Sequence, residues 1–186
     1  MDKVRRKEKA EIGELTSRCL AAFTRAGTLD LSLDRLAAKV GVSKRMLIHY
    51  FGSRDELEEQ VFALLEERLR VQFSVELFPP GATLHTAVMA LWNRSTAPES
   101  RGALRVVMDA TRRAWSGSAR GKAFYGEQQR LWVELLLKFL PDPAAVEELL
   151  QLFQGAVLVY LVTGDREPGR RALTRMILRE TGLGRG

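Results

Sequence analysis

Five side chains that can bind nucleic acid lie close together in the sequence: Lys44, Arg45, Met46, Ile48 and His49. Basic side chains bind phosphates, and an arginine can also read a guanine in the major groove of DNA. Apolar side chains can contact the methyl group of thymine. On a short helix these residues would occupy the faces that packing does not need, so the first hypothesis is DNA binding.

The elements that must position these residues are two short helices joined by a turn. Apolar residues spaced i, i+3, i+4 and i+7 predict the first helix, and they are Leu33, Leu36, Ala37 and Val40. Gly41 is expected to end it, because glycine adopts left-handed conformations without steric cost. Ser43 is placed to cap the second helix. Two helices joined by a short turn that contains glycine predict a helix-turn-helix.

The net charge of the chain is concentrated around this stretch. Residues 1–54 contain 12 Lys and Arg against 6 Asp and Glu, whereas residues 55–186 contain 17 of each. The whole excess of +6 therefore lies in the first 54 residues, as expected of a module that binds phosphates. A solvated basic surface would give the same composition. The basic run at residues 2–9 allows the same two interpretations, contact with a DNA backbone or a solvated terminus.

Helical spacing extends through the whole chain and predicts an all-α fold of about nine helices, the first of which runs from Ile12 up to Gly27. A capping box at Ser53–Glu56 begins a long helix that extends towards Phe78. Five more helices are expected at about 82–94, 101–115, 121–139, 144–163 and 169–181. We expect a DNA-binding helix-turn-helix domain at residues 1–54. An effector-binding and dimerisation domain is expected at residues 55–186, and the helix from residue 55 links the two.

The residues around the turn resemble the DNA-binding domain of TetR-family transcriptional regulators. The resemblance rests on Leu36-Ala37-Ala38-Lys39-Val40-Gly41-Val42-Ser43, Leu47, Phe51, Ser53-Arg54-Asp55 and Leu57. It covers about residues 12–65, and beyond them only the length and the helical layout match. The resemblance implies a three-helix, homeodomain-like head and a second half that binds an effector and dimerises. It also implies contacts with the DNA backbone from Ser32, Ser43, Tyr50 and Arg54.

The second helix departs from the family pattern where bases would be read. The family usually has a small residue at position 45, and often Thr at 46, Tyr at 48 and His at 50. Here these positions hold Arg45, Met46, Ile48 and Tyr50, so the operator sequence cannot be taken from relatives. Lys44, Arg45 and His49 are the candidates for contact with bases or phosphates. Met46 and Ile48 either contact thymine methyl groups or pack between helices.

Aromatic residues gather in the middle helices and suggest a site for a small hydrophobic effector. The candidate residues are Trp92, Met108, Arg112, Trp115, Phe124, Gln128 and Trp132. An aromatic stripe is more often plain core, and this alternative stays open.

The predicted helix at 144–163 is apolar on nearly all sides, which favours a dimer interface. With the last helix it is expected to form half of a four-helix interface. The interface residues would be Leu149, Leu152, Phe153, Ala156, Val159, Tyr160, Leu173, Met176 and Ile177. The alternative is a central helix buried within one protomer.

These expectations combine into a DNA-binding transcriptional regulator, a ligand-responsive repressor that binds a palindromic operator as a homodimer. The alternative is an architectural or partner-controlled DNA-binding protein of the same fold without a small-molecule effector. No catalytic motif and no metal-spaced His/Cys set occur, so no enzyme activity, cofactor or metal is expected. The single Cys19 fits the reducing cytoplasm. The longest apolar run, Ala156–Val162, is too short to span a bilayer.

Overall fold

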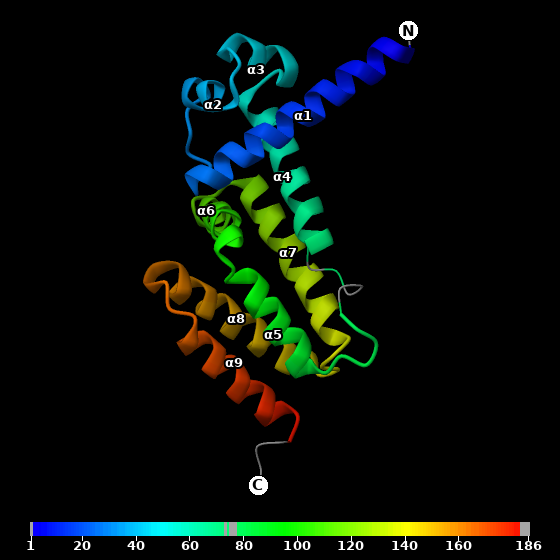
Figure 1. Cartoon of the computed structure of the whole chain (residues 1–186), viewed down its shortest axis with the longest axis vertical. Coiled ribbons are helices and arrows are strands. Elements are labelled where there is room, and N and C mark those ends of the chain that lie inside the picture. Colours follow the sequence, from blue (N-terminus) through cyan, green and yellow to red (C-terminus); the bar gives the residue numbers. More distant parts are fainter. Residues whose placement is uncertain (1, 73, 75–77, 183–186) are drawn as a thin grey trace. The chain divides into compact units, whose positions relative to one another are not determined.

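The chain folds into helices throughout its described part, as the sequence predicts. The computed structural model describes residues 2–72, 74 and 78–182, with side chains from residue 9 onwards. Within these residues there are nine α-helices, one 3₁₀ helix and no strand (Figure 1). They are α1 (Asp2–Ala26), α2 (Leu33–Val40), α3 (Lys44–Phe51), α4 (Arg54–Gln72), α5 (Leu84–Ser95), η2 (Pro98–Ser100), α6 (Arg101–Trp115), α7 (Ala119–Leu137), α8 (Pro143–Thr163) and α9 (Glu167–Glu180).

Two helix boundaries differ from the expected ones. Helix α1 begins at Asp2, well before the first apolar position Ile12, so the backbone of the basic run at 2–9 belongs to this helix. The side chains of residues 2–8 lie outside the described residues, and neither interpretation of the basic run is tested. Helix α4 ends at Gln72 and does not continue to Phe78.

The described chain forms two compact units, and each is described by itself. Unit 1 consists of Met1–Val71 and Arg105–Tyr125, and unit 2 of Gln72–Leu104 and Gly126–Gly186. This division concerns packing within the chain. The functional division into residues 1–54 and 55–186 stays a prediction.

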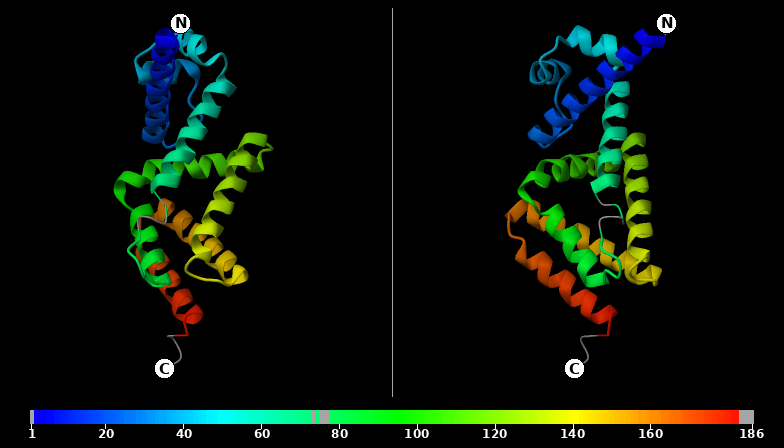
Figure 2. Two further views of the ribbon diagram at one scale, coloured as in Figure 1. Left: turned by 90° about the vertical axis from the view of Figure 1, so that its right-hand side faces the viewer. Right: turned by 45° about the vertical axis from the view of Figure 1, so that its right-hand side comes forward.

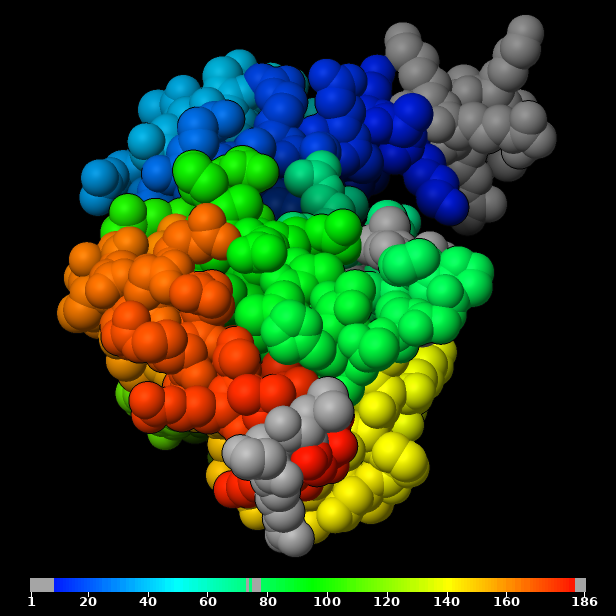
Figure 3. All heavy atoms as spheres, turned by 60° about the horizontal axis from the view of Figure 1, so that its bottom comes forward, coloured from blue at the N-terminus to red at the C-terminus, as the bar shows by residue number. Residues whose placement is uncertain are grey.

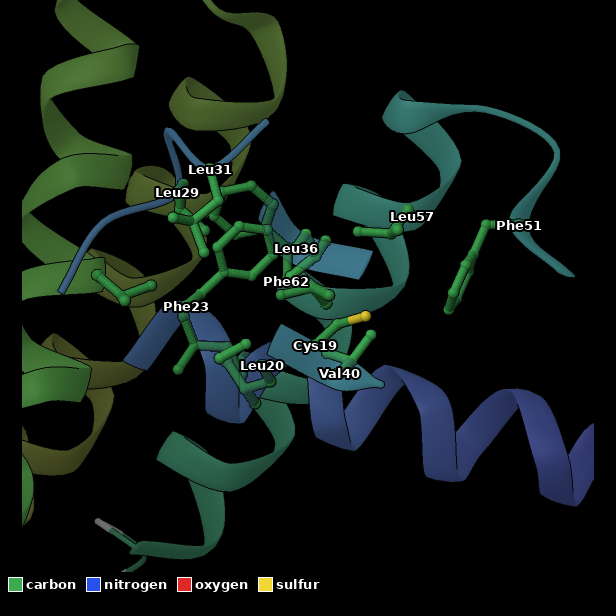
Figure 4. Close-up of a cluster of buried hydrophobic side chains, with 14 of the residues drawn as sticks. Cys19, Leu20, Phe23, Leu29, Leu31, Leu36, Val40, Phe51, Leu57 and Phe62 are labelled. Atoms are coloured by element: carbon green, nitrogen blue, oxygen red, sulfur yellow. The ribbon is translucent and has the colours of Figure 1, made fainter. Parts of the chain in front are cut away.

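Unit 1 has one hydrophobic core to which α1, α2, α3, α4, α6 and α7 all contribute. Phe23 of α1 is fully buried near its centre, and Figure 4 shows Cys19, Phe23, Leu36 and Phe62 pointing into the same interior. The ring of Phe62 packs against that of Phe124, with the ring centroids 5.2 Å apart. Burial raises the pKa of the Cys19 thiol to about 11. Cys19 is therefore protonated at neutral pH and serves as a packing residue.

Capping residues fix where α2 and α3 begin and end. The Ser32 hydroxyl accepts a hydrogen bond from the backbone N–H of Arg35, and the Ser43 hydroxyl accepts one from Met46. Gly41 ends α2 with φ 69°, in the left-handed region that disfavours other residues. These caps satisfy backbone groups at the helix ends, and each is worth about 1 kcal/mol. The predicted helix-turn-helix and its Ser43 cap are confirmed, and Ser32 caps α2 in the same way.

The turn between α3 and α4 requires glycine at position 52. Gly52 has φ 76°, and a Cβ added there would lie 2.2 Å from Oε2 of Glu56. Glu56 belongs to the predicted capping box, in which the Ser53 hydroxyl accepts a hydrogen bond of 3.1 Å from the Glu56 N–H. The start of α4 is thereby fixed one residue after Ser53.

A network of charged groups ties the loop between α1 and α2 to α6 within unit 1. The Asp109 carboxylate accepts hydrogen bonds from the Leu29 N–H at 2.8 Å and the Thr28 hydroxyl at 3.1 Å. Arg112 pairs with Asp109 at 2.8 Å and with Asp30 at 2.7 Å. Arg113 continues the network by pairing with Asp30 and, at 2.8 Å, with Glu58 of α4. The loop that leads into α2 is therefore held by residues some 80 positions away in sequence.

Replacing Asp109 by Asn is expected to lower the free energy of unfolding at pH 7 by about 1–2 kcal/mol. Burial alone would raise the pKa of the Asp109 carboxyl, but hydrogen bonds from Leu29, Arg112 and Thr28 outweigh it and hold this pKa below its usual value. The stabilisation is therefore fully present above the ordinary carboxyl pKa of about 3.9 and is lost as the pH falls through the folded-state pKa. Urea denaturation at several pH values measures the difference between the two proteins.

The difference in free energy of unfolding between wild type and Asp109→Asn should disappear at acid pH, because Asp109 is then protonated in both the folded and the unfolded protein. Asp55→Asn, at an exposed position in the first turn of α4, is the control and should change stability little at any pH. Equal stability of wild type and Asp109→Asn at pH 7 would show that this carboxylate does not hold the loop.

Unit 2 is built around α5, α8 and α9, which lie side by side (Figure 2). Trp92 of α5 is fully buried at the centre of its core. Helix α9 approaches this ring closely at Gly169, where an added Cβ would lie 2.5 Å from Cη2 of Trp92 and 3.0 Å from Cβ of Ala156. Only a residue without a side chain allows α9 to pack at this distance, so Gly169 sets the position of α9 on α5 and α8.

Helix α8 is more apolar than its neighbours. An 18-residue stretch of this 21-residue helix has a mean hydropathy of 1.5, which satisfies the length and composition of a membrane-spanning segment, but 39% of the stretch is buried inside the protein. Core helices of water-soluble proteins meet the same criteria. The apolar stretch of α8 is therefore longer than the consecutive run Ala156–Val162 indicates, because polar residues interrupt it without lowering its mean hydropathy below that of a spanning segment.

Candidate nucleic-acid interface

Helix α3 buries one face and exposes the residues proposed to bind DNA. Leu47 and Phe51, one turn apart, are 0% and 3% exposed and anchor the helix in the core of unit 1. Met46 and Ile48 are 42% and 38% exposed, so they do not pack in the core as the alternative interpretation would require. The remaining candidates on α3, Lys44, Arg45 and His49, are also exposed.

The two basic residues at the start of α3 differ in their surroundings. Lys44 Nζ lies 3.0 Å from Oδ2 of Asp34 on α2, but both side chains are more than half exposed. Such an exposed pair contributes little to stability and separates easily when a stronger anion approaches. Among the described residues Arg45 makes no hydrogen bond or ion pair. Its guanidinium is therefore available for a base or a phosphate.

Ser32 and Ser43 lie at the N-termini of α2 and α3, and both are exposed. Their hydroxyl oxygens accept backbone hydrogen bonds, which leaves each hydroxyl hydrogen free to donate to a phosphate oxygen. Backbone N–H groups at a helix N-terminus attract anions in the same way. The geometry is therefore compatible with the backbone contacts that the family resemblance implies.

Tyr50 faces α1 in this structure. Its hydroxyl donates a hydrogen bond of 3.3 Å to Oε2 of Glu11, and its ring meets that of His49 edge to face with the centroids 5.4 Å apart. The side chain is partly buried. A contact between Tyr50 and DNA would require the hydroxyl to exchange the Glu11 carboxylate for a phosphate.

Arg54 points inward, and this was not foreseen from the sequence. Its Nε donates to Glu58 at 2.6 Å, and its two Nη atoms donate to the carbonyl oxygens of Leu31 at 2.6 Å and Leu29 at 2.8 Å. The guanidinium also lies 5.6 Å from the centre of the Phe23 ring. All three of its nitrogens are thus occupied within unit 1, and they hold the loop that precedes Ser32.

Three further basic side chains are exposed on the helices that carry the candidate interface, and sequence reasoning did not single them out. Arg35 and Lys39 lie on α2. Arg18 lies on α1, and its Nη2 would be 3.3 Å from a Cβ added at Gly41 in the turn. The excess of positive charge before residue 55 was the available signal, but it did not separate these residues from the rest.

The seven effector candidates are divided between the two units. Met108, Arg112, Trp115 and Phe124 belong to unit 1, whereas Trp92, Gln128 and Trp132 belong to unit 2. Arg112 is engaged with Asp30 and Asp109, and Phe124 packs in the core against Phe62. Trp115 is 81% exposed.

Most of the residues proposed for the dimer interface lie in the core of their own unit. Leu149, Ala156, Tyr160, Leu173, Met176 and Ile177 are buried, Leu152 and Phe153 are partly buried, and only Val159 is exposed. The face of α8 that is open to a partner instead carries Leu158, Val159 and Val162, which are 54%, 47% and 78% exposed. Figure 3 shows the end of α8 and the adjoining α9 at the surface of unit 2, in orange and red.

Comparison with known proteins gives a family match for the helix-turn-helix region. Residues 17–61, which include α2, α3 and the turn, match the family model for bacterial regulatory proteins of the tetR family. No curated protein sequence gives a significant match.

Three solved structures share the fold over nearly the whole chain. A tetR-family transcriptional regulator from Streptomyces coelicolor has a TM-score of 0.73 at 19% identity, covering 94% of this chain and 80% of that one. A Rhodococcus sp. chain, provisionally assigned to the same family, has a TM-score of 0.71 at 16% identity, covering 91% and 98%. A TetR-like transcriptional regulator from Rhodococcus sp. RHA1 has a TM-score of 0.62 at 21% identity, covering 92% and 94%.

Proposed function

We propose that this protein, which carries a TetR-family DNA-binding domain and has the fold of TetR-family transcriptional regulators, is a ligand-responsive repressor that binds a palindromic operator as a homodimer. The observation that carries the proposal is the exposed face of α3, because its basic and apolar side chains project from a capped and well-packed helix. The protein acts in the cytoplasm and needs no membrane.

Different exposed side chains of α3 contact the bases and the phosphates of DNA. Arg45 reads a guanine through its O6 and N7 atoms, and Met46 and Ile48 contact thymine methyl groups. Lys44 leaves Asp34 for a phosphate, while Ser32 and Ser43 donate to the backbone from the N-termini of α2 and α3. Arg54 supports these contacts from within, because it fixes the loop that positions Ser32.

The homodimer forms through the exposed apolar stripe on α8. Gly155, Leu158, Val159 and Val162 have the spacing i, i+3, i+4 and i+7, so they lie on one face of the helix, and all four are exposed. Leu178 of α9 adds a further exposed apolar side chain. A contiguous apolar surface of this kind marks an association site, and two-fold symmetry lets one patch serve both copies. The two α3 helices then reach successive major grooves, about 34 Å apart.

A mobility-shift titration with the DNA that flanks the gene tests the proposal. We expect a discrete complex whose affinity falls steeply between about 50 and 200 mM salt, because each basic contact releases counterions from the DNA. Failure to bind any inverted repeat in this DNA, or binding that is indifferent to salt, would contradict DNA-binding regulation at this site.

Replacing Arg45 by Ala is expected to remove discrimination between operator sequences worth about 1–3 kcal/mol, because the guanine contact is lost. Stability should stay near that of wild type, since Arg45 is exposed and its side chain makes no hydrogen bond or ion pair with the described residues. Competition between the best operator and variants of it at each base pair measures the effect.

Arg25→Ala is the matched control for charge, because Arg25 is an exposed arginine in the last turn of α1. It should reduce binding to all sequences slightly and leave discrimination unchanged. If Arg45→Ala weakened binding to every sequence equally, Arg45 would be a phosphate contact and not a reader of bases.

A further inference from the structure

Three buried nitrogen atoms of unit 2 have no hydrogen-bond acceptor. They are Trp92 Nε1, Arg101 Nε and Gln128 Nε2, and no other buried side-chain nitrogen or oxygen in the described residues is unpaired. The side chains of Trp92 and Gln128 are 0% and 8% exposed. Folded proteins pair nearly all buried polar groups with protein, water or ligand, so an unpaired group points to a missing partner.

One of these donors, Trp92, belongs to a set of four packed rings, the aromatic cluster of Trp92, Trp132, Phe153 and Tyr160. The ring of Trp92 meets Phe153 at a centroid distance of 5.8 Å and Tyr160 at 6.4 Å. Trp132 packs against Phe153 at 6.2 Å. The cluster thus joins α5, α7 and α8 inside unit 2.

The other donors border this cluster. The guanidinium of Arg101 lies 5.9 Å from the centre of the Tyr160 ring. Gln128 precedes Trp132 by one turn of α7, so both side chains lie on the same face of that helix. The Tyr160 hydroxyl is already satisfied, since it donates a hydrogen bond of 2.9 Å to the carbonyl oxygen of Thr96.

The missing partner must be an acceptor. Indole and guanidinium nitrogens can only donate, so neither Trp92 nor Arg101 can pair with another donor. Arg101 also makes no ion pair with any described residue, so no carboxylate among the described residues neutralises its positive charge. Aromatic rings bind apolar groups, and N–H donors beside a guanidinium bind an anion. Together they suit an apolar molecule that ends in an anionic acceptor.

We propose that the aromatic cluster binds a small apolar carboxylate, with its hydrocarbon part against the rings and its oxygens accepting from the unpaired N–H groups. Carboxylate binding is independent of the proposed function. The role of the carboxylate as the effector of a repressor rests on it. Because ligand binding is measured without DNA, its failure would leave the DNA-binding proposal intact, and failure to bind DNA would leave the ligand result intact.

The test uses the full chain and pairs of probes that share one skeleton. Benzoate, 4-phenylbutyrate and octanoate are each compared with the amine of the same skeleton by thermal unfolding and by calorimetric titration. A ligand that binds only the folded state raises the melting temperature with concentration. We expect saturable binding and a rise in melting temperature for at least one carboxylate, and neither for its amine partner.

Substitutions identify the site. Trp92→Phe removes the indole N–H but keeps an aromatic ring, and Gln128→Met removes the amide but keeps most of the volume. Each is expected to weaken binding of the carboxylate roughly 10-fold or more, because a charge-assisted hydrogen bond is lost. Without ligand, Gln128→Met should melt no lower than wild type, since it removes a donor that has no partner. Gln129→Met, at the next position of α7, is the control and should bind as wild type does.

Two results would overturn the proposal. One is that no carboxylate raises the melting temperature more than the amine of its skeleton. The other is that carboxylates bind Trp92→Phe and Gln128→Met as tightly as they bind wild type. If a buried water paired these donors instead, Gln128→Met would lower the melting temperature and no carboxylate would bind, which also contradicts the proposal.

Discussion

Val162→Asp is expected to dissociate the proposed homodimer and to weaken binding to an inverted-repeat operator by roughly 10²–10⁴-fold, because the second half-site no longer gains from the first. Val162 is 78% exposed in the protomer, so the substitution leaves the core of unit 2 intact. A two-fold interface contains every substituted residue twice. Two carboxylates would therefore be placed in one apolar contact, where neither has a cationic partner on α8.

Sedimentation of the purified protein and titration of operator DNA measure the two effects separately. Val71→Asp is the matched control, because Val71 is an equally apolar side chain, 68% exposed at the end of α4, and it does not belong to the stripe on α8. It should sediment and bind DNA as wild type does. A Val162→Asp protein that sediments as wild type would show that the stripe of Gly155, Leu158, Val159 and Val162 is not the interface.

Arg54→Ala is expected to destabilise unit 1 by about 2–3 kcal/mol, because it leaves two backbone carbonyls without their donor and removes one of the two arginines that pair with the partly buried Glu58. The side chains of Arg54 and Glu58 are 26% and 12% exposed, so water replaces the lost contacts only in part. Loss of the contacts to Leu29 and Leu31 also loosens the approach to α2. Binding should weaken for all DNA sequences alike, because no base contact is removed.

Chemical denaturation together with binding to specific and random duplexes distinguishes the roles of Arg54 and Arg45. Arg54→Ala should lower stability and leave the ratio of specific to random binding unchanged, whereas Arg45→Ala should do the opposite. If Arg54→Ala were as stable as wild type yet bound DNA weakly, Arg54 would contact phosphate directly, as the family resemblance implies.

The sequence predicted the helices of the DNA-binding head because their signals are local. Ser32, Gly41 and Ser43 act on backbone groups within five residues, so their positions alone indicate where α2 begins and ends and where α3 begins. The apolar spacing of α2 likewise predicted its buried face, and Leu36, Ala37 and Val40 are buried as expected.

The unforeseen features depend on contacts between distant parts of the chain. Nothing near Asp109 indicates that it binds the N–H of Leu29, and nothing near Arg54 indicates that it turns inward to Leu29 and Leu31. Helix α8 is apolar on both its buried and its exposed side, so periodicity could not separate Tyr160, which is buried, from Val162, which is not.

Enrichment of bound duplexes from a pool of random DNA, with the full chain as the selecting protein, tests the central claim most directly. The proposed mode of binding predicts an enriched inverted repeat whose half-sites are centred about 10 base pairs, or a multiple of one turn, apart. It also predicts that the Arg45→Ala protein enriches the same inverted repeat but has no base preference at one position of each half-site. Enrichment of no common motif by the wild-type protein would contradict sequence-specific DNA binding by α3.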